Sequence, residues 1–249
     1  MKFDHLVLNV DKNYQMEGQF AQSIREAGLP YKPKKGKGTK GFKASNIWIG
    51  QEYFEMISIK NQDGGGWKKE WVEAYNNGER GLICLMLDVK DLNQLVQKIQ
   101  SKKIPISQPE SIKIEFFFKL ISKTMPWSNS YLDFFQNVPM QIGFQQMNNE
   151  KTRLKLEKYM VPNSTENNIT GIRRIQISGQ FTKVDFEMLM LVFDDILVEE
   201  GRLTIHLEHS QVLVFEQATE FNIQVVLKSE QSNLQNKDCW IENTHIING

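Results

Sequence analysis

The sequence has little of what a cross-linked or membrane-bound protein requires. Cys84 and Cys239 are its only 2 cysteines, so neither a disulfide framework nor a cysteine-rich zinc site is available. No stretch approaches the roughly 20 apolar residues of a bilayer span. Asp4 and His5 interrupt the N-terminal stretch that a signal peptide would keep apolar. We therefore expect a cytoplasmic protein without a membrane partner, held together by packing.

A surplus of charge of one sign is also lacking. The 30 Lys and Arg residues balance 30 Asp and Glu residues, which leaves a formal net charge of +0. Without a global field, the protein is not expected to bind nucleic acid. With 40% hydrophobic and 24% charged residues over 249 positions, the composition is that of an ordinary globular protein.

What the sequence does contain is a weak internal repeat. A strand-like run opens each of three copies, at residues 3–10, 81–89 and 171–178, and a helical pattern follows each run. The first helix is expected over 14–27, and the second begins after Asp91, a candidate N-cap. The apolar residues at helical spacing in the second and third copies are Leu92, Leu95, Val96 and Ile99, and Phe186, Leu189, Met190 and Phe193.

Strand-like runs separated by turn residues follow each helix, so each repeat is predicted to be a βαβββ unit. We predict an α+β fold in which the mixed sheets of these units curl into a half-barrel or barrel, with the helices outside. The runs are 44–49 and 53–59, then 112–121 and 130–138, and finally 202–208, 211–217 and 221–228. The predicted division is a first unit 1–60, a connector 61–80, a second unit 81–147, a connector 148–168, a third unit 169–228 and a polar tail 229–249.

Short motifs within these units carry a family resemblance. The first unit opens with Phe3-Asp4-His5-Leu6-Val7-Leu8 and closes with Tyr53-Phe54-Glu55-Met56-Ile57. Further matching text is Asn46-Ile47-Trp48-Ile49-Gly50, Gly81-Leu82-Ile83-Cys84, Asp91-Leu92, Pro126-Trp127, Phe134-Phe135-Gln136 and Ile169-Thr170-Gly171-Ile172. This pattern resembles the vicinal-oxygen-chelate superfamily, which includes glyoxalase I and the extradiol dioxygenases, and more narrowly its glyoxalase-like domain proteins. The resemblance covers most of residues 1–228.

The resemblance implies a metal-binding cup. In that superfamily two βαβββ modules curve around a cup, and each supplies one metal ligand from its first strand and one from its last. The implied cofactor is a divalent metal, Zn, Ni, Mn or Fe, in an open site with His, Gln and carboxylate donors. Carried onto this sequence, the first unit supplies His5 and Glu55, and the second supplies Cys84 and Gln136. Cys84 and Gln136 are an unusual pair for the family.

The third unit departs further from the family pattern. It offers Arg174 and Glu216, and a guanidinium cannot ligate a metal because it stays protonated and has no acceptor. We expect these two residues to form an ion pair or to hold a substrate carboxylate. Trp127, which follows Pro126 at a strand entry, is the aromatic residue expected nearest the mouth of the pocket.

Each of these residues also has a plain structural interpretation. His5 can be an ordinary hydrogen-bonded histidine, and Glu55 can lie on the solvated face of an antiparallel sheet. If Glu55 lines the cup instead, it is the natural general base. Cys84 is most simply a small buried apolar side chain. The segment 31–43 holds 6 lysines and no acid, and it is interpreted as a solvated hairpin at the mouth of the cup, with a lid for anionic substrates as the alternative.

The sequence thus leaves open whether the protein is an enzyme. The leading hypothesis is a glyoxalase-like lyase, isomerase or dioxygenase that acts on an oxygen-rich small molecule, with His5 and Glu55 as ligand or acid–base residues. The alternative is a metal-free module that binds and sequesters a small molecule. A third hypothesis is a protein-interaction scaffold that uses an exposed patch at Trp67 and Trp71. A homodimer is implied only by the resemblance, because dimers are common among similar proteins.

Overall fold

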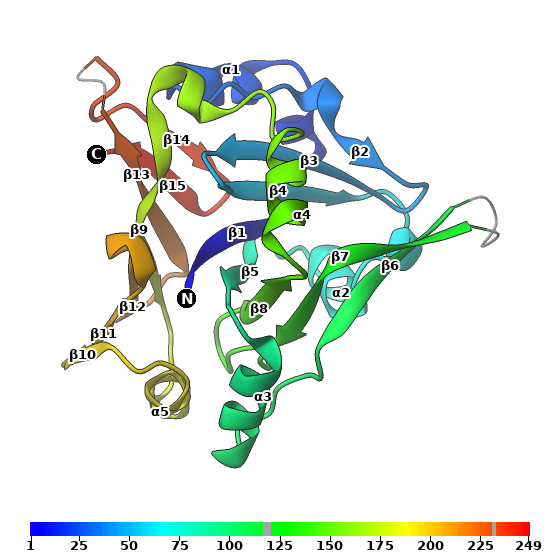
Figure 1. Ribbon diagram of the computed structural model, residues 1–249. Helices are drawn as coiled ribbons and strands as arrows, with labels where there is room; N and C mark the ends of the chain where they lie inside the picture. Colours follow the sequence, from blue (N-terminus) through cyan, green and yellow to red (C-terminus); the bar gives the residue numbers. More distant parts are fainter. Residues whose placement is uncertain (117–120, 231–232) are drawn as a thin grey trace.

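The computed structural model describes residues 1–116, 121–230 and 233–249, which form two mixed β-sheets and their helices (Figure 1). This arrangement confirms the predicted α+β class. The strands of the first sheet, in spatial order, are β2 (Lys37–Gly38), β3 (Phe42–Ile49), β4 (Glu52–Ile59), β1 (Lys2–Asn9), β5 (Gly81–Asp88), β8 (Gln141–Met147), β7 (Ile121–Tyr131) and β6 (Glu110–Phe116). The helices are α1 (Gln19–Glu26), α2 (Lys69–Asn76), α3 (Leu92–Ser101), α4 (Glu150–Glu157) and α5 (Lys183–Val192).

The first sheet is built from the first two predicted units. β1 pairs in parallel with β4, β5 pairs in parallel with β8, and β1 and β5 meet antiparallel at the centre. The two βαβββ units are therefore joined through their opening strands, and the sheet that they share curls into a half-barrel (Figure 1).

The second sheet contains the third unit and a shorter fourth one. Its strands, in spatial order, are β10 (Ile196–Glu199), β11 (Arg202–His206), β12 (Val212–Gln217), β9 (Ile169–Gly179), β13 (Asn222–Ser229), β15 (Thr244–Asn248) and β14 (Asp238–Ile241). β13 pairs antiparallel with β9 and parallel with β15, as β5 does with β1 and β8. The run at 222–229 thus opens a fourth unit instead of closing the third, and the polar tail supplies two strands of the sheet.

The second unit differs from the expected strand pattern. β7 runs straight through Pro126, where a turn was predicted, and residues 134–138 lie in the loop before β8 instead of in a strand. Pro126 is tolerated because the pairing of β6 with β7 shifts register at Ile112, a bulge where its missing N–H is not needed. Residues 117–120 of the predicted strand 112–121 lie outside the described part of the chain.

The helices follow their local sequence signals. The side chain of Asp91 accepts a hydrogen bond of 2.9 Å from the backbone N–H of Gln94, so the predicted N-cap of α3 is confirmed. The apolar residues expected on this helix, Leu92, Leu95, Val96 and Ile99, are all buried. α1 is shorter than the predicted 14–27, because residues 12–15 form a separate 3₁₀ turn.

One apolar core joins the two sheets. Leu6 and Phe54 from the first sheet and Phe215 from the second belong to it, together with Ile24 of α1 and Leu92 of α3. α1 and α3 therefore lie outside the half-barrel, as the sequence predicts. α2, from the first connector, packs instead against the opposite face of the first sheet, between β4 and β7 (Figure 1). Among the described residues, no helix has the length and apolar character that crossing a membrane requires.

Candidate functional site

The predicted first-unit residues meet on one face of the first sheet, which we call the inner face. Strand pairing places His5 between Tyr53 on β4 and Met86 on β5. Glu55, two residues after Tyr53, shares the face because side chains alternate along a strand. The sequence prediction that these two residues converge is therefore met by the geometry.

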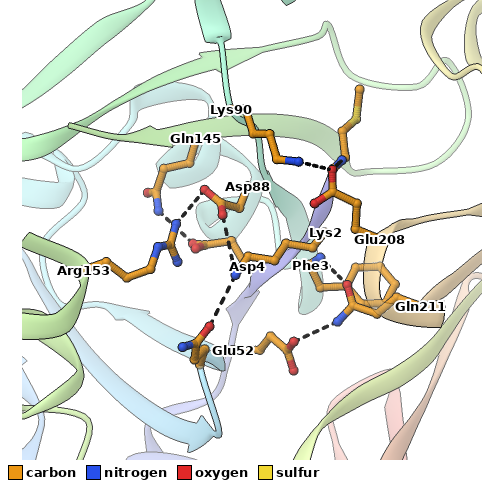
Figure 2. Close-up of polar contacts among 12 residues, drawn as sticks. Lys2, Phe3, Asp4, Glu52, Asp88, Lys90, Gln145, Arg153, Glu208 and Gln211 are labelled. Atoms are coloured by element: carbon orange, nitrogen blue, oxygen red, sulfur yellow. Dashed lines mark hydrogen bonds and ion pairs between the residues drawn. The ribbon is translucent and has the colours of Figure 1, made fainter. Parts of the chain in front are cut away.

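His5 is held on three sides. Its Nδ1–H donates to Asp4 Oδ2 at 2.6 Å, and its ring stacks on Tyr53 with centroids 4.5 Å apart and planes inclined by 13°. Its Nε2 lies 3.9 Å from Glu55 Oε2. The Asp4 carboxylate also accepts a hydrogen bond of 2.9 Å from Gln145 Nε2 (Figure 2). Because Asp4 binds the Nδ1 side, the Nε2 side of the ring is directed at Glu55.

Asp4 is a site residue that the sequence analysis missed. Neighbouring residues of a regular strand point to opposite faces, so an Asp-His pair would be split by the sheet. The pairing of β1 with β5 shifts register between Phe3 and His5, and this bulge lets both side chains meet. The available signal was a carboxylate placed next to a histidine in an otherwise apolar strand.

Glu55 is in an environment suited to proton transfer. Its side chain keeps 21% of its surface exposed. Burial raises the pKa of the Glu55 carboxyl above its ordinary value, His5 acts to lower it, and the nearby Asp4 charge raises it further. A carboxyl with a raised pKa takes up and releases protons nearer to neutral pH, which is a property of general acids and bases.

The second unit does not complete a metal site. Gln136 is exposed in the loop before β8, and its backbone N–H donates to Asp185 Oδ1 at 3.3 Å, so its predicted place beside Cys84 is wrong. In the first unit Glu55 lies opposite Val7, two residues after His5. The same position in the second unit, two residues after Cys84, is opposite Gly143, which has no donor.

Cys84 adds nothing to the donor set. Its side chain is fully buried, its Sγ lies 3.5 Å from Met86 Sδ, and burial raises the pKa of the thiol. Within the described ranges, no three His, Cys, Asp or Glu side chains gather in a way that could hold a metal ion. Catalytic metal sites take about three protein ligands, and His5 and Glu55 are two. The residues present therefore do not fit the divalent metal that the resemblance implies.

The first connector covers part of the inner face. Trp71 of α2 is 4% exposed and packs with Val7, Ile57, Cys84 and Met86. Its Nε1–H donates to the side-chain oxygen of Gln141 at 2.9 Å when that amide is oriented to satisfy both neighbours. The prediction of an exposed tryptophan patch for a scaffold is therefore wrong, because Trp71 is buried in the protein interior.

The third-unit residues, Arg174 and Glu216, lie on the second sheet, whereas His5 lies on the first. Arg174 donates to the side-chain oxygen of Gln176, and Gln176 Nε2 donates to Glu216 Oε2 at 2.6 Å. Glu216 is also 3.6 Å from Arg202 Nη1. Arg174 and Glu216 are thus linked through a glutamine and do not form the predicted direct ion pair. Trp127 is on β7 opposite Met147 and is half-buried.

Charged groups at the start of β1 lie next to Asp4. Arg153 of α4 forms an ion pair of 2.7 Å with Asp88, and Lys2 Nζ is 3.8 Å from the same carboxyl (Figure 2). These residues line a surface pocket of about 330 Å³. The pair fixes α4, a helix without buried residues, against the first sheet.

Comparisons with known proteins place the fold. No family model matches this chain, and no curated protein matches its sequence. A hypothetical protein from Staphylococcus aureus has a similar structure, with a TM-score of 0.74 and 15% identity over 100% of this chain and 98% of that chain. This likeness shows the fold.

Methylmalonyl-CoA epimerases are also among the similar structures, over part of the chain. The Streptomyces coelicolor enzyme has a TM-score of 0.41 and 10% identity, over 59% of this chain and 94% of that one. The Mycobacterium tuberculosis enzyme has a TM-score of 0.40 and 9% identity, over 60% and 90%.

Proposed function

We propose that the protein binds a small oxygen-rich molecule on the inner face and exchanges a proton with it, as a glyoxalase-like member of the vicinal-oxygen-chelate superfamily. The observation that supports this is the line of Asp4, His5 and Glu55. Two carboxyl groups and an imidazole, all largely withdrawn from water, are costly unless they are paired or used.

The chemistry that fits this line is proton transfer next to a carbonyl group. Glu55 takes the proton from the carbon, the C–H electron pair moves onto the carbonyl oxygen as an enolate, and the proton returns to carbon or oxygen. Such a step is an isomerisation and needs no further reactant. His5 is next in line to hold the proton, while Asp4 orients the ring through its hydrogen bond to Nδ1.

A metal-free binding module without catalysis is the second candidate. Gly143 and the buried Cys84 at the second-unit positions favour it, because they leave the cup without half of its donors. The two candidates share the ligand class and the inner face. They differ in whether Glu55 exchanges a proton with the bound molecule.

Hydrogen exchange at carbon separates the two candidates. Pyruvate, levulinate and dihydroxyacetone are incubated with the protein in D2O, and loss of the C–H signals is followed by proton NMR. We expect exchange with the wild type and a loss of about 100-fold in Glu55→Gln, in the range of a general base. Glu200→Gln, at an exposed turn, is the matched control.

Each other result decides between the candidates. Broadening of ligand signals without exchange, equal in wild type and Glu55→Gln, supports the binding module. If none of the three compounds shows broadening or exchange, the proposed function is contradicted.

A further inference from the structure

A single ammonium group is held above the inner face by the first connector. Lys68 immediately precedes α2 and lies between Trp67 and Trp71, which both pack towards the first sheet. Its Nζ is 5.1 Å from the centre of the Tyr131 ring and 5.8 Å from that of Trp71. Cations within about 6 Å of an aromatic ring are attracted to its face. The two rings, which meet edge to face at 5.8 Å, thus fix the position of the charge.

The position of Lys68 is across the inner face from the Asp4–His5–Glu55 line. His5, Met86, Gly143 and Tyr131 follow one another across β1, β5, β8 and β7. Three strand spacings are about 14 Å on a flat sheet, and the curl of the half-barrel shortens this distance. Since Gly143 has no side chain, Met86 is the side chain between the two ends of this row.

The electrostatics agree with that placement. Cys84 lies on the floor between the two ends, where the Lys68 charge acts to lower the pKa of its thiol and the Glu55 charge acts to raise it. Both charges are therefore near enough to act on this buried thiol, in agreement with their places at the two ends of the row. A ligand lying there has a proton acceptor at one end and a cation at the other.

Lys68 has donors to spare. Its ammonium bonds to Glu70 Oε2 at 2.8 Å, but the Glu70 side chain is 55% exposed. Exposed pairs of this kind contribute little to stability, and an ammonium has further N–H donors. By contrast, Lys2 and Arg153 at the start of β1 are both paired with Asp88.

We propose that Lys68 binds a carboxylate of the ligand, so that the site selects small carboxylic acids whose carbonyl group lies a few bonds from the carboxylate. This inference rests on the proposed function for the location of the ligand. It makes Lys68 a specificity-determining residue, and it assigns to the connector a part in recognition.

The test compares a charged ligand with its uncharged ester. Levulinate and methyl levulinate are titrated into the protein, and binding is followed by quenching of tryptophan fluorescence. We expect levulinate to bind about tenfold more tightly than the ester, as one charge-assisted hydrogen bond provides. Lys68→Met should abolish the preference, and Lys68→Arg should retain part of it. Lys69→Met is the matched control, because the Lys69 side chain is 85% exposed.

The outcomes distinguish this inference from the proposed function. If Lys68→Met keeps the preference, or if the wild type binds the two compounds equally or binds neither, the inference is overturned. If levulinate binding depends on Lys68 but no compound exchanges hydrogen, the carboxylate site stands and proton transfer fails. If Glu55-dependent exchange occurs with dihydroxyacetone while Lys68→Met changes nothing, proton transfer stands and the carboxylate site fails.

Discussion

Glu52 Oε2 accepts a hydrogen bond of 2.6 Å from the backbone N–H of Ile172, and this bond ties β4 of the first sheet to β9 of the second. Glu52 Oε1 accepts another from Gln211 Nε2 at 2.8 Å (Figure 2). Gln211 Oε1 in turn accepts from the backbone N–H of Phe3, so its amide cannot turn over without loss. Burial raises the pKa of Glu52 from 4.5 to about 7.

The first prediction is a pH dependence of stability from Glu52. Because its pKa is higher in the folded state, the folded protein binds more protons between the two values, and its free energy of unfolding falls as pH rises through this window. The fall amounts to at most about 3 kcal/mol. Glu52→Gln removes this titration. The N–H groups of the introduced amide, however, point at those of Gln211, so one donor meets another.

Urea unfolding on either side of the window measures the effect. We expect the wild type to lose its stability advantage over Glu52→Gln as pH rises, while Glu200→Gln follows the wild type at both pH values. Parallel curves for wild type and Glu52→Gln would show that Glu52 titrates as it does in water.

A second prediction concerns metal content. Because Gly143 and the buried Cys84 replace two donors, the purified untagged protein is expected to hold far less than one equivalent of Zn, Ni, Mn or Fe by elemental mass spectrometry. His5→Ala and Glu55→Ala should leave the content unchanged. A near-stoichiometric metal that disappears in both variants would restore the metal-dependent interpretation.

A third prediction tests what holds the connector in place. A Cβ at Gly41 would overlap the backbone of Gly64 and Gly65. Gly41→Ala should therefore lower the free energy of unfolding by about 1–3 kcal/mol, as overpacking does, and shift the tryptophan emission. Gly18→Ala is the control, since a Cβ there meets nothing within 4 Å. Equal stability of the two variants would contradict the close backbone contact.

The fourth prediction is that Cys84 is shielded from thiol reagents. Its buried thiol has a raised pKa, and Trp71 lies over the same cluster. A thiol reagent followed by peptide mass mapping should leave Cys84 unlabelled in the folded wild type and label it in Trp71→Ala. Trp71→Phe, which preserves most of the cover, should stay protected. Rapid labelling of Cys84 in the wild type would show that the connector does not cover it.

The repeat and the fold class could be predicted because they depend on local patterns. An apolar run opens each predicted unit, the Asp91 cap marks the start of the second helix, and the structure confirms the half-barrel that the repeat implies. The fourth unit was not predicted because the described residues between β13 and β14, 230 and 233–237, form no helix, so the strands at 238–248 had no preceding signal. The last strand of the second unit was predicted at 130–138, because Phe134 and Phe135 have a strand-like composition. The structure places this strand, β8, at Gln141–Met147.

The candidate site was predictable only for the first unit. His5 and Glu55 are on strands whose pairing follows directly from the repeat. Asp4 depends on a bulge, and Lys68 depends on how a connector packs, and neither event is encoded in a short motif. Gln136 shows the converse, since an aligned motif in a loop placed a residue where no strand exists.

Trp71 is covalently tethered to the sheet that it covers, and this makes it an intramolecular competitor for the inner face. A group on a short tether has an effective concentration in about the millimolar range or above. A ligand that needs the area under Trp71 must compete with this side chain. A ligand confined to the end near His5 and Glu55 does not meet this competition. The connector thereby sets an upper limit on ligand size, in addition to supplying Lys68 as the proposed partner of the ligand's carboxylate.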